Sequence, residues 1–511
     1  MFKNHPKGLL GAALSNMGER FGFYIMMAIL ALFLMSKFGL EKTQATIIYS
    51  IFYALIYLLA LVGGIIADKT KKYKSTILIG LILMAVGYFL IAIPTPTPVP
   101  NFALFLTITC FGLLTIAFGN GLFKGNLQAV VGQMYDNEEY KNKRDSGFQL
   151  FYMFINVGAL FAPLIAVAMR NWWVGRHGFA YNSDLPALCH RYLNKALDSS
   201  SEAFDSFSRL ATEVSGSTPA CLETFANSYL DVFNTGFHYA FGVSIIAMTI
   251  SLVVYITNKK RFPDPAAKKI AAGNSGENQM TVKEIKQRFY ALFAVFAVVI
   301  FFWFSFHQNG VTLTFFANDY TNLSMIELDL GFTVIKGAEI FQFFNPFFVV
   351  FLTPIIIALF GWLKTRGIEP STPKKIVIGM GIATIAFVVM AIGSYGLPDA
   401  AEVKKLGGLS DMERVTPLLL IGTYFILTIA ELFISPLGIA FVSKVAPPQY
   451  QGIMQGCWLG ATALGNQLLI FGTIFYENIP IWATWCVFVT VCLLSMFTML
   501  FMVKWLERVA K

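Results

Sequence analysis

Residues 9–34 read LLGAALSNMGERFGFYIMMAILALFL, an apolar run that is long enough to cross a bilayer. A span of roughly 20 apolar residues covers the hydrocarbon layer, which is about 30 Å thick. Within this run stand Glu19 and Arg20, and an ionised side chain at the bilayer centre costs about 2.5–3.5 kcal/mol on insertion scales. Such charges usually mark a pathway through the membrane. The alternative is a buried ion pair that only orders the helices.

The composition of the whole chain indicates many membrane spans. Of the 511 residues 56% are hydrophobic and only 13% are charged, whereas soluble domains have about 25% charged residues. We expect each long apolar run to be a helix, because lipid offers no partner for an irregular backbone. The sequence therefore predicts an all-α membrane protein with twelve transmembrane helices. The predicted spans are residues 9–35, 45–67, 76–94, 101–134, 146–169, 236–257, 288–317, 335–363, 374–397, 416–442, 450–476 and 480–504.

Lysine and arginine gather in every second loop. Residues 68–75, 136–145, 258–288 and 364–375 are rich in them, whereas the opposite loop at 94–100 has none. Because short basic loops are cytoplasmic, we expect an integral protein of the plasma (inner) membrane, surrounded by lipid, with both termini in the cytoplasm. The net charge of +9 then reflects topology, and nucleic acid is not an expected partner.

The chain divides into two halves of six spans, residues 1–257 and 288–511, joined by a polar cytoplasmic linker at 258–287. Each half has a basic turn after its second span, and such correspondence is typical of the parallel repeats of major facilitator transporters. We therefore expect a major facilitator fold with two six-helix bundles. In the first of these turns, Asp68 is expected to have a structural role, holding the turn against neighbouring helices.

A polar insertion at residues 171–235 interrupts the first half on the outer side. It is too long for a simple connection, so we expect it to fold as a small cap. It contains Cys189 and Cys221. These two residues either pair in an oxidising compartment or remain free thiols, because the sequence does not give their geometry.

Seven short motifs occur in a fixed order along the chain. They are NMGERFGFY at 16–24, GNGLFKGN at 119–126, FYMFINVGA at 151–159, the segment 301–317, FQFFNP at 341–346, ELFISPLG at 431–438, and GCW at 456–458 with GN at 465–466. With these motifs the chain resembles the proton-dependent oligopeptide transporters of the major facilitator superfamily. The resemblance implies an importer of di- and tripeptides that works by alternating access with proton symport and without a cofactor.

The charged residues of these motifs suit a peptide. A short peptide is a zwitterion at neutral pH, so a site that removes its water needs a cation for the carboxylate and an anion for the amine. Arg20 and Lys124 supply the cations from the first half, and Glu431 supplies the anion from the second. A bound peptide would then link the two halves. The alternative for Lys124 and Glu431 is a salt bridge with each other.

Polar and aromatic residues complete the expected peptide site. Asn156 and Asn345, one from each half, are expected to bind the peptide amide, and their alternative role is packing between helices. Tyr24, Tyr57 and Trp458 are expected to line pockets for the peptide side chains. Ser435 belongs to the same site through its place in the motif at 431–438.

Three positions depart from the pattern of the family. Asn16 replaces the first carboxylate of the first-span signature and cannot take up a proton. Met27 stands where the family commonly has Arg, and His307 where it commonly has Glu. In relatives these Arg and Glu positions are thought to pair across the outer mouth. The outer gate of this chain must therefore close differently.

The same departures leave proton coupling open. One interpretation keeps symport and assigns it to Glu19, Arg20, Lys124, Glu431 and His307, since the ordinary pKa of histidine, about 6.5, suits a switch. For His307 the alternative is a neutral ring with a hydrogen bond between helices. The other interpretation is a facilitator or a differently coupled carrier of another small solute such as nitrate.

Other classes of function are also considered. A peptide sensor that binds without transport is one alternative. An enzyme is not expected, because the histidines are scattered without the spacing of metal ligands and no catalytic set is recognised. No metal or other cofactor is therefore predicted.

Overall fold

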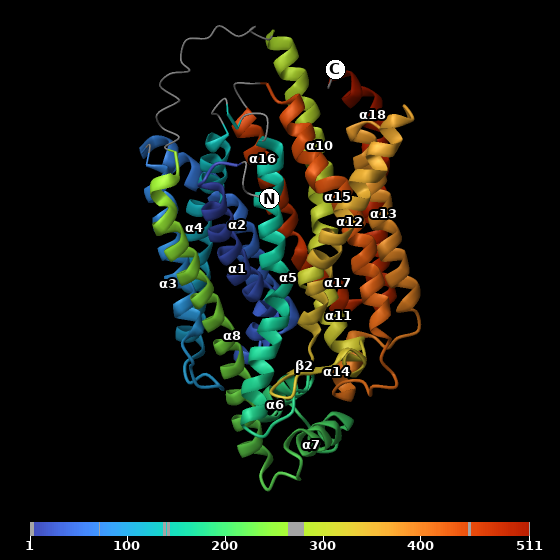
Figure 1. Ribbon diagram of the computed structural model, residues 1–511. Helices are drawn as coiled ribbons and strands as arrows, with labels where there is room; N and C mark the ends of the chain where they lie inside the picture. Colours follow the sequence, from blue (N-terminus) through green and yellow to red (C-terminus); the bar gives the residue numbers. More distant parts are fainter. Residues whose placement is uncertain are drawn as a thin grey trace.

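The computed structural model describes residues 5–70, 72–135, 139–140, 144–263, 281–447 and 451–509. In these ranges twelve helical regions are long and apolar enough to cross a membrane (Figure 1), which confirms the predicted number. The side chain of Asp68 and residues 264–280 of the predicted linker lie outside the described part of the chain. The structural role of Asp68 therefore stays a prediction.

Six long helices form the first bundle, coloured blue to green in Figure 1. Glycines let them pack closely: a Cβ at Gly63 would lie 2.1 Å from the carbonyl oxygen of Gly121, and one at Gly80 would lie 2.6 Å from that of Gly119. Small residues of this kind allow membrane helices to approach each other closely. The helices are α1 (Leu9–Phe38), α2 (Lys42–Thr70), α3 (Tyr73–Ala92), α4 (Phe102–Met134), α5 (Arg144–Arg176) and α8 (Leu222–Asn258), which η2 (Lys259–Arg261) extends.

The second bundle is coloured yellow to red in Figure 1. Two of its spans, residues 282–320 and 456–478, are interrupted. One breaks at η3, where a Cβ at Gly310 would lie 2.1 Å from the Tyr49 hydroxyl, so only glycine fits there. The elements are α10 (Val282–Phe306), η3 (His307–Gly310), α11 (Thr312–Tyr320), η5 (Ala338–Phe343), α12 (Phe344–Thr365), α13 (Thr372–Gly393), α15 (Pro417–Val445), α16 (Gln451–Gln467), α17 (Leu469–Asn478) and α18 (Ile481–Val509).

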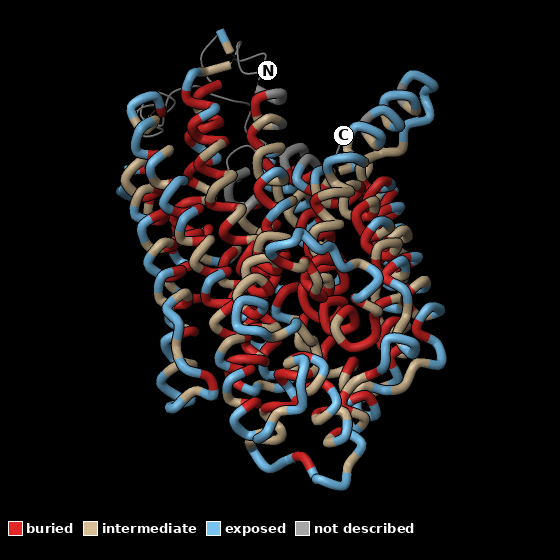
Figure 2. The backbone as a smooth tube through the Cα atoms, turned by 60° about the horizontal axis from the view of Figure 1, so that its bottom comes forward, coloured by how far each residue is buried: buried red, intermediate tan, exposed pale blue. Residues whose placement is uncertain are grey.

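The two ends of the molecule differ. At one end, here the cap end, the insertion forms α6 (Leu185–Leu193) and α7 (Glu202–Ser215), and the second bundle adds the short elements (Figure 1). The opposite end, here the linker end, carries both chain termini (Figure 2). The short elements are η4 (Leu323–Ile326), the antiparallel strands β1 (Leu328–Asp329) and β2 (Val334–Ile335), and α14 (Ala400–Leu406).

The insertion is a folded cap whose end continues directly into α8. The Ser201 hydroxyl accepts a hydrogen bond from the backbone of Phe204 and caps α7, whose apolar face is buried. Cys189 is buried, Cys221 is exposed, and both are free thiols. The sequence left open whether Cys189 and Cys221 form a disulfide, and in the structure they do not.

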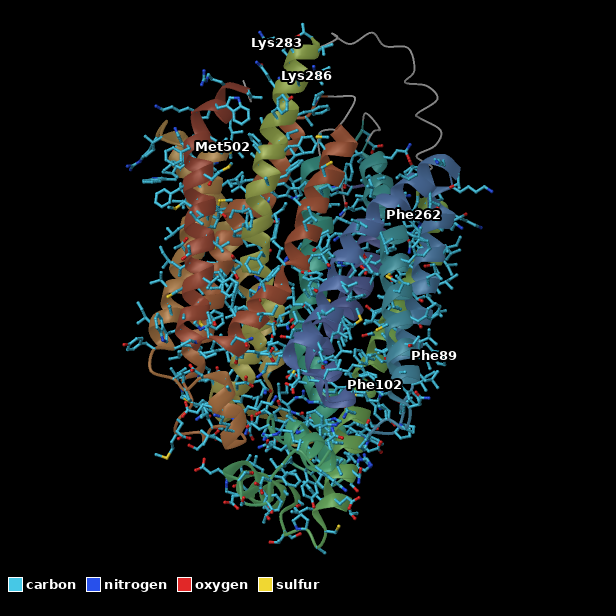
Figure 3. The ribbon with its side chains drawn as sticks, turned by 180° about the vertical axis from the view of Figure 1, so that it is seen from behind. Phe89, Phe102, Phe262, Lys283, Lys286 and Met502 are labelled. Atoms are coloured by element: carbon cyan, nitrogen blue, oxygen red, sulfur yellow. The ribbon has the colours of Figure 1, made fainter. Side chains whose placement is uncertain are left out.

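Buried residues occupy the middle of the molecule and exposed residues its periphery (Figure 2). Large apolar side chains cover the outside of the bundles: Phe89 and Phe102 point outward from the first bundle (Figure 3) and are 55% and 46% exposed. Lysines such as Lys283 and Lys286 stand instead at the linker end of α10 (Figure 3). This arrangement is that of a protein surrounded by lipid.

Candidate functional site

Glu19 and Arg20 bind each other in the interior of the first bundle. Arg20 donates from Nε and Nη2 to the two carboxylate oxygens of Glu19 at 2.5 and 2.6 Å. Asn120 of α4 donates to the same carboxylate at 2.6 Å, and Arg20 lies 4.6 Å from the ring centroid of Phe23. Both charges are buried, so each needs the other. A peptide carboxylate that binds Arg20 would therefore share it with Glu19.

Lys124 is the second cation of the expected site, and its ammonium contacts an aromatic ring, whereas Arg20 is paired with a carboxylate. It lies on α4 four residues after Asn120, is partly buried, and places its ammonium 4.6 Å from the ring centroid of Tyr57. No hydrogen bond or ion pair joins it to another residue in the described ranges. A cation–π contact stabilises a cation without neutralising it. Lys124 is thus available to bind an anion.

Glu431 is the acidic counterpart in the second bundle. Asn345 of α12 donates to its carboxylate at 2.8 Å and to the Thr428 hydroxyl at 3.1 Å. The amide of Asn345 therefore positions the carboxylate of Glu431. Lys124 and Glu431 have separate partners, so the alternative of a mutual salt bridge is not what the structure contains.

Tyrosines of the first bundle lie between these charges. Tyr24, Tyr57 and Tyr152 are all within electrostatic range of Glu431 and of Arg20. Tyr57 also contacts the ammonium of Lys124. Arg20 of one bundle and Glu431 of the other therefore act on the same tyrosines, and the joint binding of a peptide by the two bundles stays a prediction.

Trp458 packs between helices of the second bundle. It is 3% exposed and lies 6.2 Å from Phe296, measured between ring centroids. Its indole lies against the backbone of α15, where a Cβ at Gly438 would be 2.1 Å from Cη2 of Trp458. Gly438 is therefore required for this packing, although the sequence did not single it out.

The other two polar residues of the expected peptide site are Asn156 on α5 and Ser435 on α15. The amide of Asn156 donates to the carbonyl of Tyr152, one turn earlier on its own helix, at 3.2 Å. Ser435, one turn after Glu431 on α15, is partly buried. Both lie on helices that carry other site residues.

His307 lies in an aromatic enclosure at the break between α10 and α11. Its ring stacks on Trp303 with 4.9 Å between centroids and lies 4.9 Å from the ring of Tyr53. Its Nδ1 lies 2.5 Å from Oδ1 of Asn466, in a hydrogen bond between α16 and the break. His307 makes the interhelical hydrogen bond that was considered as the alternative to a proton switch.

The two bundles meet at the cap end. Lys42 of α2 contacts Asp319 of α11 at 2.5 Å, and the Tyr476 hydroxyl donates to the same carboxylate at 2.8 Å. Deeper in the molecule the Thr46 and Thr473 hydroxyls lie 2.9 Å apart. These contacts join the two bundles at the cap end, and none of them involves Asn16 or Met27.

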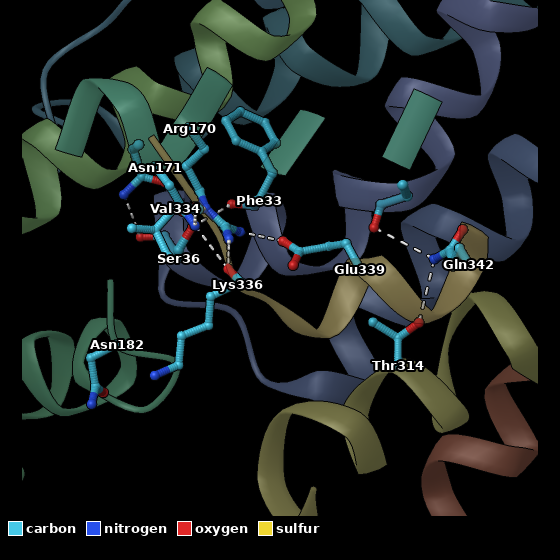
Figure 4. Close-up of polar contacts among 12 residues, drawn as sticks. Phe33, Ser36, Arg170, Asn171, Asn182, Thr314, Val334, Lys336, Glu339 and Gln342 are labelled. Atoms are coloured by element: carbon cyan, nitrogen blue, oxygen red, sulfur yellow. Dashed lines mark hydrogen bonds and ion pairs between the residues drawn. The ribbon is translucent and has the colours of Figure 1, made fainter. Parts of the chain in front are cut away.

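A buried ion pair also joins the two bundles near the cap end. Arg170 at the end of α5 donates from Nη1 to Oε1 of Glu339 in η5 (Figure 4). The two side chains are 1% and 0% exposed. Asn171 donates to the backbone carbonyls of Val334 and Lys336 at 2.7 and 2.9 Å. Sequence reasoning missed this pair, although Glu339 is an acidic residue inside a predicted span.

The cap also joins the bundles. Asp184 accepts a hydrogen bond from Arg414 at 2.5 Å, Ser206 donates to the carbonyl of Leu406 at 2.8 Å, and Lys404 contacts Glu41 at 2.8 Å. A cavity of about 490 Å³ remains between the cap, α1 and α14. It is lined by charged residues of both signs, including Lys42, Arg170, Asp184, Arg191, Asp319 and Lys404.

The described ranges contain no group of three or more His, Cys, Asp or Glu residues that could hold a metal ion.

Known proteins resemble this chain over most of its length. Residues 74–276 and 266–482 match the model of the POT family. The peptide transporter YePEPT of Yersinia enterocolitica is 31% identical over 478 residues, which cover 91% of this chain and 87% of that protein. Dipeptide and tripeptide permease B of Xenorhabdus bovienii is 26% identical, with 99% of this chain and 97% of that protein covered.

Solved structures share the fold at lower identity. A peptide transporter POT in complex with sulfate superposes with a TM-score of 0.72 at 23% identity, covering 100% of this chain and 96% of that one. A POT family transporter in complex with 5-aminolevulinic acid gives 0.71 at 20% identity, with 100% and 98% covered. The expected major facilitator fold is therefore confirmed.

Proposed function

The chain belongs to the POT family and is a membrane peptide transporter, not an enzyme, and from this we propose that it imports di- and tripeptides by alternating access with proton symport. The relatives whose names specify peptides, the permeases of di- and tripeptides, support this size of substrate. The transport site is proposed to be the space between Lys124 and Glu431.

The separation of unlike charges between the bundles carries the proposal. In the described part of the chain, Lys124 of the first bundle has an aromatic ring beside its ammonium, and Glu431 of the second has the neutral amide of Asn345. Desolvating one lone charge is costly, and a ligand with both signs offsets the cost at both places. A peptide zwitterion has its carboxylate and amine at opposite ends, as this arrangement requires.

Binding in this place couples the ligand to rocking of the bundles. A ligand shifts a conformational equilibrium only by its different affinity for the two states. A peptide that touches α4 and α15 at once contacts both bundles, so its affinity changes when they move. The contacts at the cap end support a state that is closed on this side.

The linker end is proposed to face the cytoplasm. Basic loops at this end follow the positive-inside rule, and the linker and both termini would then be cytoplasmic, with the cap outside the plasma (inner) membrane. We infer from the contacts at the cap end that this state belongs to the half of the cycle that opens toward the cytoplasm.

Protons are proposed to bind at the buried carboxylates of this pathway. Glu431 accepts from the neutral amide of Asn345, so a proton can replace the peptide amine as its charged partner. Glu19 is held by Arg20 and Asn120 and would titrate only when this network changes. His307 is held by Asn466 in the present state and would act only after that bond breaks.

Uptake into proteoliposomes tests this function. Radiolabelled dialanine should accumulate above its outside concentration when the outside is acidic, and a proton ionophore should abolish accumulation but leave peptide exchange. Equal distribution with and without the gradient would identify a facilitator. Binding without flux would identify a sensor, and nitrate transport without peptide affinity would contradict the zwitterion site.

A further inference from the structure

We propose that the hairpin at residues 326–335, part of the connection from α11 to η5, is a lipid-contact element. Its apolar side lies in the boundary between the headgroups and the acyl chains of the leaflet at the cap end. The hairpin contains β1 and β2, and in its turn the backbone of Leu330 donates to the carbonyl of Thr333 at 2.9 Å. The proposed peptide site does not use this segment, so peptide transport does not bear on its role.

Strand pairing gives the hairpin one apolar side. Side chains alternate between the two faces of a strand. Leu328 and Leu330 therefore share one face, and Glu327 and Asp329 share the other. Leu328 lies opposite Ile335 in the antiparallel register, and directly opposed residues point to the same side of a sheet. The leucines and Ile335 thus belong to one continuous apolar side.

The β2 part of this side packs on the first bundle. Ile335 is 8% exposed and forms a small buried cluster with Val167 of α5 and Ile340 of η5. The Thr333 hydroxyl donates to the backbone carbonyl of Ala168 of α5 at 2.8 Å. The apolar side of the hairpin is therefore turned toward a membrane-spanning helix, near the cap end (Figure 1).

The β1 part of the same side is uncovered. Leu328 is 54% exposed, Leu330 is 43% exposed, and Phe332 in the turn is 71% exposed. Single exposed apolar residues are normal on a protein surface, whereas several neighbours together indicate a partner. The side chains that extend beyond α5 need an apolar environment that the described part of the chain does not supply.

The surface of α5 beside the hairpin faces lipid. Val157 and Phe161 are 39% and 51% exposed. Leu164 and Ala168, against which the hairpin packs, follow on the same helix face. Tyr152, which lies within electrostatic range of the transport-site charges, precedes Phe161 by about two and a half turns, so the two side chains point in opposite directions. The apolar side of the hairpin continues this lipid-facing surface.

Polar contacts hold the hairpin against α5. The Asn171 side chain donates to the backbone carbonyls of Val334 and Lys336 at 2.7 and 2.9 Å (Figure 4). These bonds satisfy the backbone along the edge of β2, which acyl chains cannot do. The edge of β1 requires hydrogen bonds from headgroups or their water. The hairpin therefore fits the boundary region and not the centre of the hydrocarbon layer.

The opposite side of the hairpin is polar. Glu327 pairs with Lys336 at 3.2 Å, and the Asp329 carboxylate accepts from the backbone of Gly331 at 2.7 Å. An element with one apolar and one charged side lies in the plane of a membrane interface, with its apolar side buried about 5–10 Å into the boundary of headgroups and acyl chains. Phospholipid is the partner that matches both sides.

Photo-crosslinking identifies what covers the apolar side. p-Benzoylphenylalanine is incorporated at Phe332, and the purified chain is irradiated in liposomes of phosphatidylethanolamine and phosphatidylglycerol. Mass spectrometry should find a phospholipid adduct in a yield similar to that obtained at Phe89, an exposed residue on the outside of the first bundle (Figure 3). The same group at Glu213, an exposed polar position of α7 in the cap, should give no lipid adduct.

Spin labels measure the depth independently. They are attached through an unnatural amino acid, which spares the native cysteines, at Leu330 or at Glu327, the matched control on the polar side of the hairpin. Power saturation with oxygen and with a water-soluble nickel complex, calibrated with labelled lipids, should place Leu330 roughly 10–15 Å from the bilayer centre. The label at Glu327 should be more accessible to nickel than to oxygen.

Four results would contradict a lipid partner. A crosslink from Phe332 to a second copy of the chain, or protection of Leu330 from both oxygen and nickel, would identify a protein interface. No lipid adduct at Phe332, or equal nickel access at Leu330 and Glu327, would place the apolar side in water. Each of these results overturns the proposal. If the variant at Phe332 does not fold, Leu328 on the same side carries the photoreactive group, and the same outcomes apply.

Discussion

The ammonium of Lys124 lies over the ring of Tyr57, with 4.6 Å between Nζ and the ring centroid. The two residues come from α4 and α2 of the first bundle. The ring holds the cation in place without a counter-ion, so the positive charge stays available. In the second bundle Glu431 is held by the neutral amide of Asn345 at 2.8 Å.

Replacing Lys124 by Gln should weaken peptide binding. The variant keeps a polar side chain but loses the charge for the peptide carboxylate, and a hydrogen bond to a charged group contributes about 1.5–3 kcal/mol. We expect the Kd for dialanine to rise by roughly 10- to 100-fold. Isothermal titration measures the change. K286Q, which removes an exposed lysine at the linker end, should bind as the wild type does.

Replacing Glu431 by Gln should remove the charge while keeping the geometry. The Gln carbonyl still accepts from Asn345, so the fold around α12 and α15 should be preserved. We expect a loss of affinity of roughly 10-fold or more for the peptide amine, together with loss of accumulation under a proton gradient. Retained gradient-driven accumulation would show that the coupled proton binds elsewhere.

Adding a methyl group at Gly438 should displace Trp458. The Cβ of G438A would lie 2.1 Å from the indole, which must leave its place against α15. Overpacking of this kind costs about 1–3 kcal/mol, so both thermal stability and peptide affinity should fall. The matched control is G422A on the same helix, where a Cβ meets nothing within 4 Å. Equal behaviour of the two variants would contradict the assigned packing.

Docking of the cap should weaken in acid through His190. Its Nε2 donates to the carbonyl of Ser36 at 2.7 Å, and burial lowers the pKa of the ring below its ordinary value of 6.5. The docked cap thus favours the neutral ring. This contribution is complete above pH 6.5 and is lost as the pH falls toward the lowered pKa.

Thiol labelling measures this effect. Burial raises the pKa of Cys189 beside His190, whereas backbone hydrogen bonds lower the pKa of the exposed Cys221. With a disulfide reagent that is active in acid, the labelling rate of Cys189 relative to Cys221 should rise as the pH falls below 6.5. H190Q, which can still donate to Ser36, should reduce that rise. An unchanged ratio in the wild type would contradict this role of His190.

The charged residues of the transport site could be predicted because they contrast with their surroundings. Glu19, Arg20, Lys124 and Glu431 are ionisable groups inside apolar runs, where a charge is costly and therefore noticeable. The same reasoning applied to Glu339 would have found the second pair. Its partner Arg170 stood just beyond a predicted span and resembled an ordinary loop cation.

Partners between helices could not be predicted in the same way. That Asn345 holds Glu431, and that Asn466 holds His307, depends on how separate helices pack. The breaks in the spans were also missed, although the break at η3 falls on the polar residues 307–310, HQNG. At this break Gly310 approaches the Tyr49 hydroxyl closely, and such a tertiary contact cannot be predicted from the sequence.

The affinities of three related ligands test the zwitterion site most directly. Dialanine, its C-terminal amide and its N-acetyl derivative are titrated into the wild type, K124Q and E431Q. The wild type should lose affinity for both derivatives, K124Q should no longer distinguish the amide from dialanine, and E431Q should no longer distinguish the N-acetyl form. If both variants discriminate among the three ligands as the wild type does, Lys124 and Glu431 do not bind the peptide termini.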